Sequence, residues 1–244
     1  MKFLWFFTLA SAVSLIFTAC SDATEKMDIP QAVSTVSSHP VPVAEKKTLP
    51  NPGKFRTAEE MVAAGFKRYG IEKGALIFRM DGVVNGTEHL FFDNWGWREA
   101  KYTRTTTDAG TFQERTNEVQ YIDGELRYVY HPDTKTADYF ESPQIQQTAD
   151  RYQTKDMVAV GIEIIKNMGG EPAGTGKIGH IECEIWELKK YRTTLYMWQG
   201  LTMFEQSFTG NLPVRRTCVQ IKTEEEIPLE KLVMPEGVKV ANAK

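Results

Sequence analysis

Hydrophobic and polar positions alternate in short runs through residues 75–222, the pattern of β-strands that bury one face. Turn residues separate the runs, and the dipeptides Asp81-Gly82 and Asp123-Gly124 are typical of hairpin turns. The pattern predicts strands at about 75–80, 87–93, 96–105, 112–122, 126–130, 136–140, 178–189, 193–198, 202–208 and 214–222. Most of the chain after residue 75 is therefore expected to form antiparallel sheet.

Helices are expected at a few places around these strands. Thr57-Ala58-Glu59-Glu60 fits a capping box, which begins a helix that we expect to end at Gly70. Apolar residues at helical spacing predict a second helix over Asp156–Met168, stopped by Gly169-Gly170. The tail 227–240 contains two prolines and is expected to form a short helix and an extended end. This order of elements predicts an α+β fold with one large, curved antiparallel sheet.

Several of the predicted strands carry apolar side chains on both faces. Leu195 and Met197 point one way, whereas Tyr196 and Trp198 point the other. Such a sheet is covered on both faces, or is covered on one face and lines a cavity with the other. The candidates to line an apolar cavity are Trp95, Trp97, Trp186, Met197 and Trp198. The alternative is that these large side chains are ordinary core.

The N-terminus has the pattern of an export signal. Lys2 precedes an apolar run over residues 3–17, which is shorter than the ~20 residues that a transmembrane helix needs. Phe17-Thr18-Ala19-Cys20 resembles the lipobox of bacterial lipoproteins, in which the cysteine is acylated and becomes the first mature residue. We therefore predict a signal peptide at 1–19 and a palmitate-type lipid anchor on Cys20. The alternative is an ordinary signal peptide cut near Ala19.

Residues 20–56 show neither helical nor strand periodicity and contain several prolines, which predicts a flexible tether. The folded domain is expected over 57–240. By the same lipoprotein resemblance, Ser21 indicates the outer membrane, because an Asp at that position would favour the inner membrane. The domain is then expected to face the periplasm, close to the membrane that holds its anchor.

Four segments of the domain resemble the family of lipoprotein localisation factors, LolA and LolB. They are the hairpin at 121–133, the strand at 176–187, the Trp-Gln-Gly hairpin at 196–203 and the Met-Pro-Glu-Gly ending at 234–240. The resemblance implies an antiparallel half-barrel whose concave side is covered by helices. It also implies a lipid, an acyl chain or a lipoprotein as the ligand of that cavity.

Charge and cysteine content narrow the function further. The formal net charge is −3 without clustered Lys and Arg, which excludes a typical nucleic-acid binder. Besides Cys20 the chain has Cys183 and Cys218, which could pair in an oxidising compartment. In a simple meander their strands lie three apart, roughly 14 Å, whereas a disulfide needs Cα atoms within about 7 Å. The sequence leaves this pairing open.

Catalytic and metal-binding motifs are weak or absent in the sequence. The segment 169–177 resembles a phosphate-binding loop, but Glu171 stands where the loop requires Gly. Lys177 is followed by Ile178, where the loop requires Ser or Thr. His180, Glu182 and Glu184 alternate along one strand, which is more typical of a solvated face than of a metal site. We therefore expect no enzyme activity, no cofactor and no metal. The sequence favours a membrane-anchored lipid-binding protein, and the alternative is a structural or interaction lipoprotein of an envelope complex.

Overall fold

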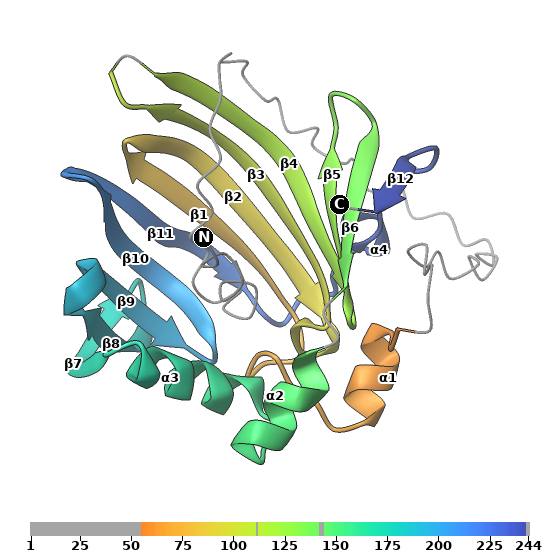
Figure 1. Cartoon of the computed structure of the whole chain (residues 1–244), viewed down its shortest axis with the longest axis horizontal. Helices are drawn as coiled ribbons and strands as arrows, with labels where there is room; N and C mark the ends of the chain where they lie inside the picture. The colour runs from red at the N-terminus through yellow and green to blue at the C-terminus, as the bar shows by residue number, and fades with distance from the viewer. Residues whose placement is uncertain (1–54, 111, 142–143, 243–244) are drawn as a thin grey trace, which may run out of the picture.

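The computed structural model describes residues 55–110, 112–141 and 144–242 (Figure 1). The predicted signal peptide, the lipid site at Cys20 and nearly all of the predicted tether lie outside these residues, so they stay predictions.

One curved sheet of twelve strands makes up most of the described chain (Figure 1). The strands are β1 (Gly74–Gly82), β2 (Val84–Asp93), β3 (Arg98–Asp108), β4 (Gln113–Asp123), β5 (Leu126–His131), β6 (Thr136–Glu141), β7 (Glu171–Ile178), β8 (Ile181–Leu188), β9 (Thr193–Trp198), β10 (Leu201–Thr209), β11 (Leu212–Lys222) and β12 (Lys239–Asn242). Their order in the sheet is β12-β6-β5-β4-β3-β2-β1-β11-β10-β9-β8-β7. Two antiparallel meanders, β1–β6 and β7–β11, are thus joined where β1 pairs with β11.

All of the predicted strands are present, and β7 and β12 are additional. Strand β7 covers the segment 171–178, which is rich in glycine and lies almost wholly exposed. It has no buried face to produce an alternating pattern, and its pairing with β8 at the sheet edge defines it. The short β12 adds in parallel to β6 at the opposite edge.

The helices are α1 (Ala58–Ala63), α2 (Gln144–Tyr152), α3 (Met157–Asn167) and α4 (Leu229–Leu232), with short 3₁₀ turns η1 (Asn94–Gly96) and η2 (Lys189–Tyr191). The capping box is confirmed, since the Glu60 amide donates to Thr57 Oγ1 and the Thr57 amide donates to Glu60 Oε2. Helix α1 ends well before Gly70, because Gly65 takes a left-handed φ of +87° and turns the chain away. Helix α2 was not predicted, and it buries Ile145 and Ala149 along one side.

The helices pack on different parts of the sheet. Helix α3 packs Ile162, Ile165 and Met168 onto β8 and β9. Helices α1 and α2 lie by the strand ends, where Met61, Phe66, Trp97 and Ile145 share a core cluster (Figure 1). Helix α4 packs on the opposite side of the sheet from α3, against β2 and β3. The expected cover of the concave side by helices is therefore not confirmed. Below, the sheet surface under α3 is called the α3 face, and the surface under α4 is called the α4 face.

The described residues contain no helix that is both long enough and apolar enough to cross a membrane.

Candidate functional site

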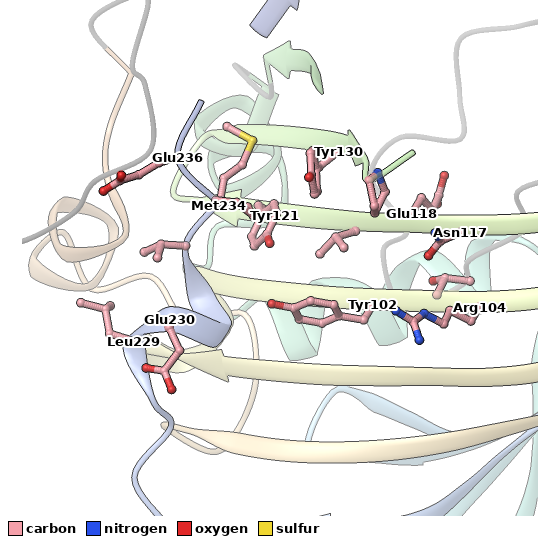
Figure 2. Close-up of a pocket in the computed structure, with 15 residues that line it drawn as sticks. Tyr102, Arg104, Asn117, Glu118, Tyr121, Tyr130, Leu229, Glu230, Met234 and Glu236 are labelled. Carbon is pink, nitrogen blue, oxygen red and sulfur yellow. The ribbon is translucent and has the colours of Figure 1, made fainter. Parts of the chain in front are cut away.

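A pocket of about 600 Å³ lies on the α4 face, between β3–β5 and the C-terminal segment 229–236 (Figure 2). Its sheet side is formed by Tyr102, Val119, Tyr121, Tyr130 and Pro132, and its opposite wall by Leu229, Val233, Met234 and Pro235. The polar residues at its boundary are Thr103, Arg104, Asn117, Glu118, Glu230 and Glu236. The pocket is thus mainly apolar and aromatic, as small-molecule sites commonly are.

Strand alternation explains why these tyrosines meet. Tyr102 lies opposite Val119 in the β3–β4 register, and Val119 lies opposite Tyr130 in the β4–β5 register. Paired residues of neighbouring strands share a face, so side chains from three strands form one continuous floor. Within it the rings of Tyr102 and Tyr121 meet edge to face, with centroids 6.3 Å apart.

The C-terminal segment is fixed over this floor by two contacts. The Tyr102 hydroxyl donates to the backbone carbonyl of Lys231 at 2.9 Å. Leu232 is almost completely buried in the same core cluster as Tyr121 and Tyr128. The chain beyond Leu232 therefore runs along the sheet as the outer wall of the pocket.

Charged residues lie at both ends of the pocket (Figure 2). Glu230 and Glu236 lie at the end with Leu229 and Met234, whereas Arg104 and Glu118 lie at the end with Asn117 (Figure 2). Asn117 is oriented by its donation from Nδ2 to Asp133 Oδ1 at 3.0 Å. Burial raises the pKa of Tyr102, so its phenol stays neutral at physiological pH. The site therefore offers an aromatic and apolar floor, with Arg104 and the carboxylates of Glu118, Glu230 and Glu236 at its boundary.

The five residues predicted to line a cavity are not in this pocket. Trp186 and Met197 are buried beneath α3, and Trp97 is buried among α1 and α2 residues, where its indole donates to the Phe66 carbonyl. Trp198 packs half-buried against a third cluster, and Trp95 stacks under the Lys67 ammonium. The structure thus distributes them over several clusters, and their role as cavity lining stays a prediction.

The tyrosines of the pocket were missed from the sequence. Tyr121 and Tyr130 lie within the 121–133 segment. Each lies on a strand in which every second side chain points to the same face. Nothing local indicated that residues 229–236, about a hundred positions later, would cover that face.

The α3 face carries a network of buried charges instead of a plain apolar surface. Glu88 accepts hydrogen bonds from the Arg216 guanidinium, and the Lys101 ammonium lies 4.0 Å from its other oxygen. These cations outweigh the effect of burial and lower the pKa of Glu88. Arg216 also donates to the Thr202 carbonyl at 2.8 Å and lies over the Phe78 ring.

A second carboxylate on this face ties the sheet to the loop before β1. Glu99 accepts from both terminal nitrogens of Arg68 and from the hydroxyl of Tyr69. Arg68 in turn donates to the Gly96 carbonyl at 3.0 Å. Glu99 is therefore fully occupied by groups of the chain itself.

Two other groups of this face are less well matched. Arg127 donates through Nη2 to the neutral side chain of Gln120. Glu205 is buried, and burial raises its pKa despite the nearby Arg216. A carboxyl in that environment is stabilised in its protonated form.

Cys183 and Cys218 are both buried free thiols. They belong to the same core cluster, although their strands lie three apart in the sheet order. Burial raises the pKa of both thiols, and that of Cys218 reaches about 11.

Among the described residues no group of three or more His, Cys, Asp and Glu side chains has the arrangement of a metal site. His180 lies exposed in the turn before β8, and Glu182 and Glu184 lie exposed on that strand. This is the solvated face that the sequence favoured.

Comparisons with known proteins define no family for the chain. No protein-family profile matches it, and no curated protein matches it. An uncharacterized conserved protein from Thermus thermophilus is 10% identical over 76% of this chain and 99% of its own, with a TM-score of 0.43. MucB is 10% identical over 75% of this chain and 64% of its own, with a TM-score of 0.38. Lipoprotein LppX of Mycobacterium tuberculosis is 12% identical over 65% and 90%, with a TM-score of 0.31. These low scores carry no argument about function, which has to come from the residues of the site.

Proposed function

We propose that this protein is a lipid-anchored envelope protein that binds an amphiphile with an acyl chain in the pocket on the α4 face. The observation that carries the proposal is this pocket of about 600 Å³, which is lined by tyrosine, leucine, valine and methionine side chains. Sites for small ligands span about 300–1,000 Å³ and are lined mainly by apolar and aromatic groups.

The position of Arg104 supports one orientation for a ligand with an anionic head. An acyl chain beside Tyr102 and Tyr121 would extend toward Met234, and its polar head would lie near Arg104 and Asn117 (Figure 2). Each buried methylene contributes about 0.8 kcal/mol. The affinity should therefore rise roughly fourfold for each added CH₂ until the chain fills the pocket.

Fluorescence titration with cis-parinaric acid, an 18-carbon fatty acid, tests this directly. The chain from residue 21 onward, which lacks Cys20, is exported behind a cleavable signal and purified without detergent. Saturable binding is expected, and decanoate through palmitate should displace the probe with increasing affinity. Absence of saturable binding would overturn the proposal and favour the interaction lipoprotein with no small ligand.

A matched pair of leucines locates the site. Leu229 lines the pocket and Leu212 lies on β11 outside it, and both side chains are exposed. Leu229→Arg should weaken parinarate binding at least tenfold, whereas Leu212→Arg should leave it unchanged. Equal effects of the two substitutions would place the ligand elsewhere.

The anchor has its own test. The lipobox resemblance at Cys20 supports attachment by acyl chains, and two lipid signals suffice for stable anchoring. Replacement Cys20→Ser should move the protein from the membrane fraction to the soluble fraction of expressing cells. Continued membrane retention of this variant would contradict lipid attachment at Cys20.

A further inference from the structure

Arg127 on β5 is a buried cation without a matching carboxylate hydrogen bond. Its Nη2 donates to Gln120, a neutral partner, and its Nε is buried with no hydrogen-bond partner among the described residues. A buried donor without a partner costs free energy, and the cost is larger for a charged group. A guanidinium N–H without an acceptor is suited to an oxyanion, because hydrogen bonds between Arg and phosphate are charge-assisted.

Other cations surround the same place. Lys101 lies opposite Gln120 in the β3–β4 register, so Lys101 and Arg127 approach Gln120 from two neighbouring strands. Burial is the largest cause that lowers the pKa of Lys101, and the charges of Arg127 and Arg216 lower it further against the opposing effect of Glu88. Burial likewise lowers the pKa of Arg127, and the charge of Arg68 adds to that effect.

The carboxylates nearby are engaged by other groups. Glu99 is held by Arg68 and Tyr69, and Glu88 is held by Arg216 with Lys101 at 4.0 Å. Glu118 accepts from Gln120 at 2.8 Å, and its charge acts on Arg127 without a direct hydrogen bond between the two in the described residues. The positive charge around Gln120 is therefore only partly compensated.

This place lies near Arg68 of the loop before β1 but away from α3 and α4. Helix α3 packs on β8 and β9, toward the other end of the strand order, and α4 packs on the opposite face. The pocket on the α4 face, proposed above to bind an acyl chain, lies on that opposite side as well. A site here would be separate from it.

We propose that the α3 face binds a phosphate group between Arg127 and Lys101, with Nε of Arg127 donating to a phosphate oxygen and the Lys101 ammonium adding positive charge. The phosphate belongs either to a free anion or to the headgroup of a lipid, because both present the same oxygens. Binding supplies the missing acceptor for Nε and neutralises the excess positive charge. It does not depend on the proposed acyl pocket.

Isothermal titration separates a free anion from a lipid headgroup as the source of the phosphate. The chain from residue 21 onward is titrated with inorganic phosphate and with dihexanoyl phosphatidic acid, at constant ionic strength in chloride. Saturable binding of phosphate alone identifies a free anion, and binding of the phosphatidic acid alone identifies a lipid headgroup. Arg127→Gln should weaken the binding at least tenfold. The exposed Arg79, which pairs with Asp81, provides the control Arg79→Gln, which should bind as the wild type does.

Two results would overturn the proposal: no saturable binding of either compound to the wild type, or unchanged binding to Arg127→Gln. Nitrogen-15 spectra of the wild-type arginine Nε–H groups cover the case in which that variant does not fold. The buried Nε–H of Arg127 is expected to exchange slowly with solvent and to shift on addition of the ligand found by titration. Slowly exchanging Nε–H signals that do not move would contradict the site.

Discussion

The Tyr69 hydroxyl donates to Glu99 Oε2 at 2.6 Å in the interior of the protein. Arg68, the preceding residue, pairs with the same carboxylate at 3.0 Å. One carboxylate of β3 thus fixes two consecutive residues of the loop that leads into β1. Tyr69 also packs its ring on Phe92, with centroids 4.7 Å apart.

Removal of that hydroxyl should destabilise the domain. Burial raises the pKa of Tyr69, so its phenol remains a donor throughout the neutral range. A hydrogen bond to a charged group contributes about 1.5–3 kcal/mol, and we expect Tyr69→Phe to lose about that much in urea unfolding. The half-exposed Tyr191 gives the control, since Tyr191→Phe should change stability by less than about 0.5 kcal/mol. Equal stability of the two variants would show that the Tyr69 bond contributes nothing.

The buried Glu205 predicts an unusual dependence of stability on pH. Burial and the Glu88 charge raise its pKa above the ordinary 4.5, so the folded state binds the proton more tightly than the unfolded state. The favourable contribution of the neutral carboxyl is complete below pH 4.5 and is lost as the pH rises through the folded-state pKa.

Glu205→Gln should therefore stabilise the protein at pH 7, because the neutral amide avoids the cost of burying a charged carboxylate. The gain should vanish at pH 4. Thermal unfolding at the two pH values measures it, with the exposed Glu182→Gln as the control. A gain that is the same at both pH values would rule out ionisation of Glu205 as its cause.

The two cysteines should resist alkylation in the folded protein. Both thiols are buried, and their raised pKa values keep them protonated. The chain that starts at residue 21 should take up no iodoacetamide at pH 8 and two equivalents after unfolding in urea without reductant. Zero uptake after unfolding would instead show that Cys183 and Cys218 had formed a disulfide.

A pair of glycines separates backbone strain from steric contact. Gly110 and Gly124 both have positive φ, +83° and +60°. A Cβ at Gly110 would meet nothing within 4 Å, whereas a Cβ at Gly124 would lie 1.9 Å from the Arg56 carbonyl oxygen. Gly110→Ala should lose about 1–2 kcal/mol, the cost of a left-handed residue. Gly124→Ala should lose clearly more in the same urea titration, and equal losses would show that the chain at Arg56 moves aside without cost.

Local patterning accounts for most of the strands of this fold. Burial alternates most clearly along β1, β2, β5 and β9, because one face of each is buried. The Asp123-Gly124 dipeptide marks a tight hairpin because Gly124 needs a positive φ. The exposed β7 lacked such a pattern, since pairing at an edge involves only its backbone. Helix α2 was missed because it buries only a narrow stripe that includes Ile145 and Ala149.

The candidate sites depended on the tertiary structure. The sequence by itself determined that large aromatic side chains would alternate along the strands and be buried, which the structure confirms for Trp186 on β8. Only the folded chain decided that residues 229–236 cover Tyr102 and Tyr121, and that Lys101 and Arg127 approach each other on the opposite face. The physical reason is that alternation fixes which side chains share a strand face. Pairing between distant strands and the docking of the C-terminal segment decide which of those side chains meet.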